Sequence, residues 1–266
     1  MIFHSSIENS YLWLPLIGFT IGFFASVIGS GGGFFFLPAL ILLYNVPAQT
    51  AVATSLAATL PICIVGSIGH FRSNHIYLRI GLIFALAGIF GAVAGAGLSN
   101  LLTSGQLKTG FGIYSLFIAL QILISTYRIK KFNKTGAELP GMSGSKKKRR
   151  GSYYGFMAGM VTGTFGTSGA APVLAGLLSM HIPLKVVAGT SLMIITVTTF
   201  AALSTHFLIG KIDLTLVGLL TSGAVIGAFT GPRFLAGIKT DRVESPARVW
   251  YAVGLLIFGT LLIAVN

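Results

Sequence analysis

The sequence predicts an all-α polytopic membrane protein with two homologous halves, about eight spanning helices and additional short half-helices or re-entrant segments at glycine-rich breaks. The chain has 266 residues, of which 54% are hydrophobic and only 9% are charged, and its mean hydropathy is +0.87. An ordinary soluble domain carries roughly 25% charged residues. A soluble core could not bury this much apolar surface, so we expect the chain to lie in a lipid bilayer.

The two halves are indicated by residues that recur in the same order 136 positions apart. The matched pairs are Pro47 and Pro183, Ser55 and Ser191, His70 and His206, Ile76 and Ile212, Gly91 and Gly227, and Gly95 and Gly231. We therefore expect a first membrane repeat over residues 1–127, a basic linker over 128–151 and a second membrane repeat over 152–266. In membrane transporters, the working site lies where such repeats meet.

The apolar runs can be taken in order as helices, given that a spanning helix needs about 20 apolar residues. The first run, Tyr11–Ile28, has Glu8 and no basic residue before it, so we interpret it as a retained helix and not a cleaved signal peptide. The other long runs are Ala51–Gly69, Ile80–Leu98, Leu107–Tyr127, Tyr153–Phe165, Val186–Phe207, Leu214–Phe229 and Val249–Val265.

Two further runs, Phe34–Tyr44 and Ala171–Ser179, are too short to cross comfortably. Each follows a glycine-rich break and ends before an X-Pro dipeptide, Val46-Pro47 or Ile182-Pro183, which disfavours helical continuation. We interpret both runs as half-helices or re-entrant segments.

The distribution of charge predicts the orientation. Nine of the 18 Lys and Arg residues lie between Arg128 and Arg150, and basic loops stay on the cytoplasmic side. We expect this linker to be cytoplasmic, and its run Lys146–Arg150 to be disordered and close to anionic lipid headgroups. The basic residues lack an aromatic-bearing fold, so nucleic acid is not an expected partner.

The second copy carries its basic cluster one helix later than the first copy does, at Arg233, Lys239, Arg242 and Arg248. Placing this cluster in the cytoplasm requires the second copy to be inverted, with both termini outside. Parallel copies remain an alternative. The five acidic residues, Glu8, Glu138, Asp213, Asp241 and Glu244, all lie outside the long apolar runs, which argues against a carboxylate proton relay.

The two glycine-rich breaks are the predicted substrate site. Their residues are Gly29, Ser30, Gly31, Gly32 and Gly33 in the first copy, and Gly166, Thr167, Ser168 and Gly169 in the second. Glycine breaks a helix and exposes backbone N–H groups, and such backbone survives in a membrane only inside protein or against a water-filled cavity. The helices that follow begin at Phe34 and Ala171, and a helix N-terminus favours an anion.

Repeated hydroxyl pairs, Thr54-Ser55 and Thr190-Ser191, add neutral donors. The pattern predicts a site for a small oxyanion with no basic side chain inside the membrane. Close helix packing is the alternative role of the breaks, and it is the one we favour for Gly91-x-x-x-Gly95 and Gly227-x-x-x-Gly231.

His70 and His206 each end a long run and are each followed by Phe. Each could bind an anion or titrate near neutral pH, or be an interfacial residue without such a role. His4, His75 and His181 lack metal-ligand spacing with Cys or carboxylate partners, and we expect no metal. Cys63 is the single cysteine, which excludes an internal disulfide. The glycine runs match neither a P-loop nor a dinucleotide fingerprint, so we expect no cofactor. The sequence does not indicate an oligomeric state.

The chain resembles the TauE/SafE family of sulfite exporter-like permeases. The resemblance rests on Gly29-Ser-Gly-Gly-Gly with Pro38, on Val46-Pro47 leading to Ala51-Val-Ala-Thr-Ser55, on His70-Phe71-Arg72, and on Gly91 to Gly95, with weaker counterparts in the second copy. It implies a multi-pass inner-membrane permease that exports a small anion such as sulfite, a sulfonate or a related sulfur-containing or organic anion. A Na⁺-coupled importer and an intramembrane enzyme are alternatives, the enzyme being disfavoured because no carboxylate is available to orient His70 or His206.

Overall fold

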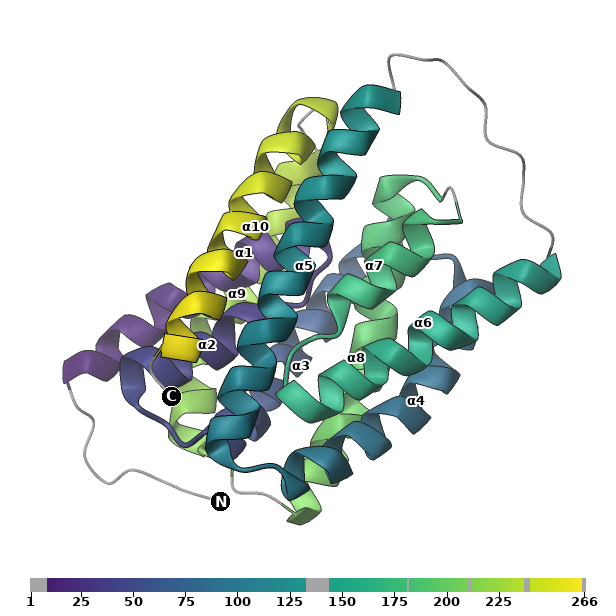
Figure 1. The fold of residues 1–266 in the computed structure, drawn as a ribbon. Coiled ribbons are helices and arrows are strands. Elements are labelled where there is room, and N and C mark those ends of the chain that lie inside the picture. The colour runs from purple at the N-terminus through teal and green to yellow at the C-terminus, as the bar shows by residue number, and fades with distance from the viewer. Residues whose placement is uncertain (1–8, 133–143, 181, 210–211, 237–239, 265–266) are drawn as a thin grey trace.

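The protein is all-helical in the computed structural model, which describes residues 9–132, 144–180, 182–209, 212–236 and 240–264 (Figure 1). A 3₁₀ helix, η1 (Asn9–Trp13), is followed by α1 (Leu14–Ile28), α2 (Gly33–Tyr44), α3 (Ala48–Arg72), α4 (Leu78–Leu101), α5 (Ser104–Phe132), α6 (Gly144–Phe165), α7 (Ala170–Leu178), α8 (Leu184–Ile209), α9 (Leu214–Ala236) and α10 (Thr240–Ala264).

Five helical segments of the described chain are long and apolar enough to span a membrane: Ala48–Arg72, Leu78–Leu101, Ser104–Ile124, Lys185–Leu208 and Leu214–Gly231. Shorter apolar helices cover Tyr11–Val27, Gly33–Tyr44 and Ala252–Ala264. The expectation of about eight spanning helices is thus supported for five. Large apolar side chains of α4 are exposed, including Leu86 at 60% and Phe90 at 72%, as a lipid-facing surface requires.

The two short helices predicted after the glycine-rich breaks are confirmed. α2 has 12 residues and α7 has 9. α2 ends because Asn45 adopts a left-handed conformation, with φ of 51°, and donates its N–H to the carbonyl of Leu40, a common way to end a helix. Pro47 then starts the turn into α3.

Helices from the two halves of the sequence pack in parallel pairs, α4 beside α6 and α1 beside α9. A Cβ atom on Gly91 or Gly95 would overlap the carbonyl oxygen of Phe156 or Met160 on α6, respectively. Likewise, a Cβ on Gly227 would overlap the carbonyl oxygen of Phe19 on α1. These glycines allow two backbones to approach closely, which confirms the prediction that they serve packing.

Two pairs of helices at matching places in the two halves, α3 with α8 and α5 with α10, run antiparallel to each other. In α3 and α8, the Cβ position of Gly66 lies 2.9 Å from Leu192 Cδ1, whereas that of Gly189 lies 2.8 Å from the Cβ of His70. A later residue of α3 therefore meets an earlier residue of α8. α5 and α10, which lie side by side in Figure 1, show the same reversal.

This arrangement defines two ends of the helix bundle. α3 ends where α4, α6 and α8 begin, and we call this end the basic end because it carries Arg72, Arg79, Lys185 and the run Lys146–Arg150. At the opposite end, α4 and α8 end and α5 and α9 begin.

The expectation that Lys146–Arg150 is disordered is wrong, because these residues form the first turns of α6.

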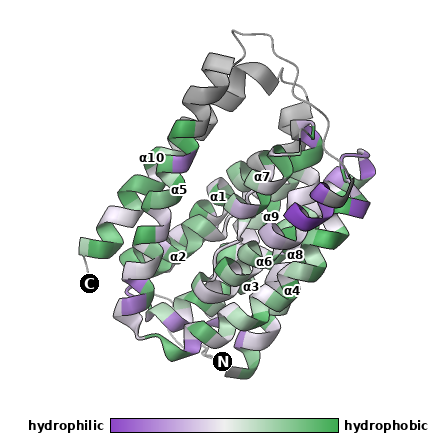
Figure 2. Ribbon diagram, turned by 45° about the vertical axis from the view of Figure 1, so that its right-hand side comes forward, coloured by the Kyte–Doolittle hydropathy of each residue, from purple (hydrophilic) through white to green (hydrophobic). Residues whose placement is uncertain are grey.

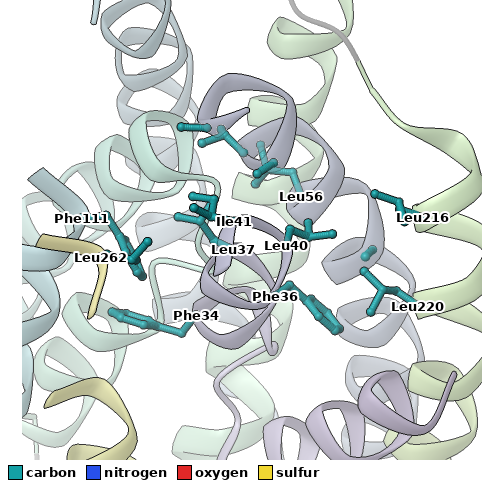
Figure 3. Close-up of a cluster of buried hydrophobic side chains, with 14 of the residues drawn as sticks. Phe34, Phe36, Leu37, Leu40, Ile41, Leu56, Phe111, Leu216, Leu220 and Leu262 are labelled. Carbon is teal, nitrogen blue, oxygen red and sulfur yellow. The ribbon is translucent and has the colours of Figure 1, made fainter. Parts of the chain in front are cut away.

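The largest core cluster surrounds the short helix α2 (Figure 3). Phe34, Phe36, Leu37 and Leu40 of α2 are all at most 2% exposed and point toward α3, α5 and α9. Burial of such side chains stabilises by about 1.5–3 kcal/mol each relative to water. α2 is therefore held on several sides, which fixes the position of its N-terminus.

Candidate functional site

The chain is broken between α1 and α2 and again between α6 and α7. Gly29 and Gly32 have φ of 77° and 81°, and Gly166 and Gly169 have φ of 65° and 55°. Residues with a Cβ rarely adopt these angles, so glycine is required where each helix stops and the next begins. The breaks occupy matching places in the two halves, as the sequence predicted.

Both breaks are buried inside the protein. Every residue from Gly29 to Phe34 and from Gly166 to Ala170 is buried, as expected of broken backbone in a membrane. The Cβ position of Gly29 lies 2.7 Å from the Cα of Ala188 on α8, and that of Gly166 lies 2.6 Å from the Cα of Val52 on α3. Each break is thus pressed against a helix from the other half.

The two breaks also touch each other. The hydroxyl of Ser168 donates a hydrogen bond to the carbonyl of Ser30. The Cβ position of Gly33 lies 2.8 Å from the backbone nitrogen of Ser168 and 3.2 Å from the carbonyl carbon of Thr167. The N-termini of α2 and α7 therefore meet within the core. Because the first N–H groups of a helix lack intrahelical acceptors, this meeting point has positive electrostatic character.

Two serines on long helices form hydrogen bonds to the break of the other half. Ser55 Oγ on α3 lies 2.9 Å from the carbonyl oxygen of Gly166 and 3.3 Å from that of Gly33. Ser191 Oγ on α8 lies 2.7 Å from the carbonyl oxygen of Gly29. These hydroxyls act as donors to backbone carbonyls and hold both breaks in place.

Thr54 and Thr190, which precede these serines in the chain, bond residues just before the starts of other helices and do not bond the breaks. Thr54 Oγ1 accepts a hydrogen bond of 3.1 Å from the N–H of Asp213, just before α9. Thr190 Oγ1 accepts one of 2.9 Å from the N–H of Tyr77, just before α4. Asp213 itself is buried, at 3% exposure, and its Oδ1 accepts the N–H of Leu216 at 3.1 Å. This acid therefore caps the start of α9.

Three hydroxyls at the meeting point of the breaks have no hydrogen-bond partner within the described part of the chain: Ser30, Thr59 and Thr167. All three side chains are at most 1% exposed. Ser30 and Thr167 hold the same place in their respective breaks, one residue after Gly29 and Gly166. A buried hydroxyl without a partner costs free energy, so these groups are candidates for contact with a transported solute.

Thr59 was missed by the sequence reasoning. Its Oγ1 lies 3.0 Å from the Cβ position of Gly33, beside the N-terminus of α2. The comparison of halves did not mark it because Ile195 stands 136 positions later. The signal that could have found it is its spacing of four residues from Ser55, which places both side chains on one face of α3.

The two histidines lie near opposite ends of the bundle. His206 is 6% exposed, and its Nε2 lies 2.7 Å from the carbonyl oxygen of Gly163. His70 is 5% exposed. Its ring lies beside the backbone of Ser26, but its Nε2 makes no hydrogen bond with any described residue. Both rings are more buried than simple interfacial residues would be.

Within the described ranges, no group of three or more His, Cys, Asp or Glu side chains could hold a metal ion. The chemistry that the site offers is hydrogen bonding from backbone N–H groups and neutral hydroxyls. Apolar helices, exposed apolar faces and broken helices meeting in the core together define an integral membrane protein of the transporter class.

The chain belongs to the TauE/SafE family. The sequence model of the family described as "Sulfite exporter TauE/SafE" matches residues 14–262. Among relatives, a probable membrane transporter protein, YdhB, from Bacillus subtilis is 27% identical over 82% of this chain and 88% of its own length. A second from that organism, YunE, is 24% identical over 90% of this chain and 94% of its own. MJ0441 from Methanocaldococcus jannaschii is 24% identical over 73% of each chain.

Proposed function

We propose that this membrane transporter is a permease for a small anion, bound where the N-termini of α2 and α7 meet. The observation that carries the proposal is the set of buried hydroxyls without described partners, Ser30, Thr59 and Thr167, beside two helix N-termini. Anions are favoured at helix N-termini, and hydroxyl donors satisfy oxyanion oxygens. The family's description as a sulfite exporter supports sulfite, a sulfonate or a related anion as the substrate.

The proposed direction is out of the cytoplasm. An inside-negative potential favours outward movement of an anion by about 2.3 kcal/mol per charge per 100 mV. Export therefore needs no coupling ion. The basic end, with Lys146–Arg150 exposed except for the half-buried Lys147, is the end we assign to the cytoplasm of a cell with an inner membrane, following the positive-inside rule.

We further propose that the two halves are inverted repeats that rock against each other. Supporting this, α3 and α8 occupy matching places but run antiparallel, as a two-fold axis in the membrane plane requires. The contacts are also reciprocal, because Ser55 bonds Gly166 while Ser191 bonds Gly29. Rocking about this axis would expose the meeting point first to one side and then to the other.

The Na⁺-coupled alternative is less well supported. It would use break carbonyls as ligands, yet the carbonyls of Gly29, Ser30 and Gly166 already accept hydrogen bonds from serine hydroxyls. An intramembrane enzyme has less support still, since Nε2 of His206 is engaged with the Gly163 carbonyl and not with a nucleophilic hydroxyl.

The test is efflux of radiolabelled sulfite from proteoliposomes at imposed membrane potentials. We expect efflux to accelerate as the interior is made more negative, and to proceed without Na⁺. A matched set of liposomes bearing Ser30→Ala/Thr167→Val protein, which removes both hydroxyls and nearly keeps the side-chain shapes, should lose most of this flux. Flux that ignores voltage, or that needs a Na⁺ gradient, would contradict the proposal.

A further inference from the structure

The charge of the protein is strongly asymmetric between the two ends of the bundle. At the basic end, Arg72, Arg79 and Lys185 are exposed; with the adjacent run Lys146–Arg150 we call them the basic rim. Figure 2 shows purple, hydrophilic residues at the start of α6 and others at the opposite end of the bundle, so the asymmetry is one of charge and not of polarity. The residues 136 positions away from Arg72, Arg79 and Lys185 are uncharged: Leu208, Thr215 and Gln49. The positive-inside rule already favours cations at this end, and their exposure makes it the end at which an anion from solution first meets positive charge.

Two members of the basic rim, Lys185 and Arg72, lie close to His70 along the helices. Lys185 lies four residues before Gly189 on α8, hence on the same face of that helix, and the Cβ position of Gly189 lies 2.8 Å from His70 Cβ. Arg72 follows His70 by two residues at the end of α3. His70 therefore lies one helical turn inside the rim.

His70 and the first break contact the same turn of α8. The same turn of α8 that contacts His70 at Gly189 contacts Gly29 at Ala188. The hydroxyl of Ser191, on the next turn, holds the carbonyl of Gly29. A continuous series of contacts thus runs from the exposed rim through His70 to the broken backbone.

Both histidine rings contact the backbone of their own half, His70 at Ser26 and His206 at Gly163, and they differ at Nε2. At the far end, Nε2 of His206 is engaged with the carbonyl of Gly163. At the basic end, Nε2 of His70 has no acceptor or donor within the described residues, although the ring is 5% exposed and lies beside the Ser26 backbone. When Nε2 carries a proton, this buried nitrogen can donate a hydrogen bond to an anion that enters past the exposed cations.

We propose that the basic rim and His70 form an anion-collecting mouth on one face of the transporter only. This rests on the proposed function in that the collected anion would pass to the meeting point of the breaks. Clustered charge of one sign raises the local concentration of counter-ions and their rate of association by 10-fold or more at low salt. The mouth would therefore load the site from the basic end, which is the direction that export requires.

The probe for this mouth is naphthalene-1,3,6-trisulfonate, a fluorescent trianion too large and too highly charged to cross. We expect it to inhibit sulfite flux at low salt when added to the basic face, using inside-out membrane vesicles, and not from the other face, using right-side-out vesicles. The double variant Arg72→Gln/Lys185→Gln should raise the inhibitory concentration about tenfold. The effect should shrink in 0.5 M salt, where the Debye length is only about 4 Å.

The matched control is Lys108→Gln, which removes a cation near the start of α5, at the opposite end; inhibition should be unchanged. His70→Gln keeps a hydrogen-bonding group and should preserve inhibition, whereas His70→Phe should weaken it. Equal inhibition from both faces, or full inhibition of Arg72→Gln/Lys185→Gln, would overturn the mouth. Unchanged inhibition of His70→Phe would remove His70 from it.

Two further measurements distinguish the mouth from a lipid-binding surface and from a failure of the proposed transport. If the rim binds lipid headgroups and not solutes, the difference between wild type and Arg72→Gln/Lys185→Gln will vanish in pure phosphatidylcholine liposomes, which overturns the proposal. If the wild type carries no sulfite or other small anion, the proposed function fails. The mouth is then still tested by fluorescence titration of the trisulfonate onto purified protein in neutral detergent, where Arg72→Gln/Lys185→Gln must bind about tenfold more weakly.

Discussion

Ser191 donates a hydrogen bond of 2.7 Å to the carbonyl oxygen of Gly29, although the two residues lie 162 positions apart in the chain. Its counterpart Ser55 makes the matching bond to Gly166 at 2.9 Å. The long helices α8 and α3 thus each form a hydrogen bond that fixes the position of the break in the other half. The breaks, which offer backbone N–H groups to a solute, are positioned by side chains that the solute need not touch.

Removing either hydroxyl should destabilise the protein. Ser55→Ala and Ser191→Ala each leave a buried carbonyl without a donor, and we expect each to lower the free energy of unfolding by about 1 kcal/mol. The measurement is thermal or denaturant unfolding in detergent. Ser204→Ala is the control, because its exposed hydroxyl bonds only the Phe200 carbonyl of its own helix, and it should change stability by less than about 0.5 kcal/mol. Equal effects of all three would contradict the structural role.

The glycines that end α1 and α6 should not tolerate alanine. Gly29→Ala and Gly166→Ala force a Cβ into the left-handed region and against the backbone of Ala188 or Val52, at a combined cost of about 3 kcal/mol. We expect little monodisperse protein after purification. Gly97→Ala is the control, since a Cβ there meets nothing within 4 Å, and it should express normally. Well-behaved Gly29→Ala protein would show that the break is not built as described.

Removing the hydroxyl of Thr59 should affect stability and transport in opposite directions. Thr59→Val keeps the side-chain shape and removes a buried hydroxyl without a described partner, so stability should rise by up to about 1 kcal/mol. Apparent affinity for the anion should fall about tenfold, because a hydrogen bond to a charged group is lost. Thr167→Val should behave alike.

The control for this pair is Thr198→Val, whose hydroxyl bonds the Ile194 carbonyl of its own helix at 3.2 Å. It should leave anion affinity unchanged. Sulfite uptake kinetics and thermal unfolding on the same preparations supply both numbers. A gain of stability with unaltered affinity would place Thr59 outside the substrate site.

Cys63 should report on opening of the breaks. It is the single cysteine, is 0% exposed, and its Sγ lies 4.0 Å from the carbonyl oxygen of Gly31. Buried thiols are inert, so N-ethylmaleimide should label it at least about tenfold more slowly than a cysteine placed at exposed Ser204 in a Cys63→Ser background. Sulfite should change the labelling rate of Cys63 and leave that of the cysteine placed at Ser204 unchanged. Rapid labelling that is indifferent to sulfite would indicate that Cys63 lies elsewhere.

The assignment of the basic end to the cytoplasm can be tested with two cysteines introduced into the Cys63→Ser background. Lys148→Cys lies at the basic end and Lys108→Cys at the other. An impermeant maleimide added to intact cells should label Lys108→Cys and spare Lys148→Cys, with the reverse in inside-out vesicles. The opposite pattern would reverse the orientation, and with it the proposed loading side.

The sequence by itself determined the class of protein, the places where helices break and the glycines that pack helices. Apolar runs and glycine clusters are local, and the physics that acts on them is local too: the lipid core offers no hydrogen-bonding groups, and residues with a Cβ rarely adopt the angles at Gly29 and Gly166. The predicted short helices and the packing role of Gly91 and Gly227 followed from this.

Only the tertiary structure decided which hydroxyls are engaged and which have no partner. Thr54 and Ser55 are adjacent and looked equivalent in sequence, yet one accepts from Asp213 and the other donates to Gly166. Thr59 became a candidate only through its distance to Gly33. The partners Gly166 and Asp213 lie 111 and 159 residues away in the chain, so their identity depends on how helices pack and not on the residues beside them.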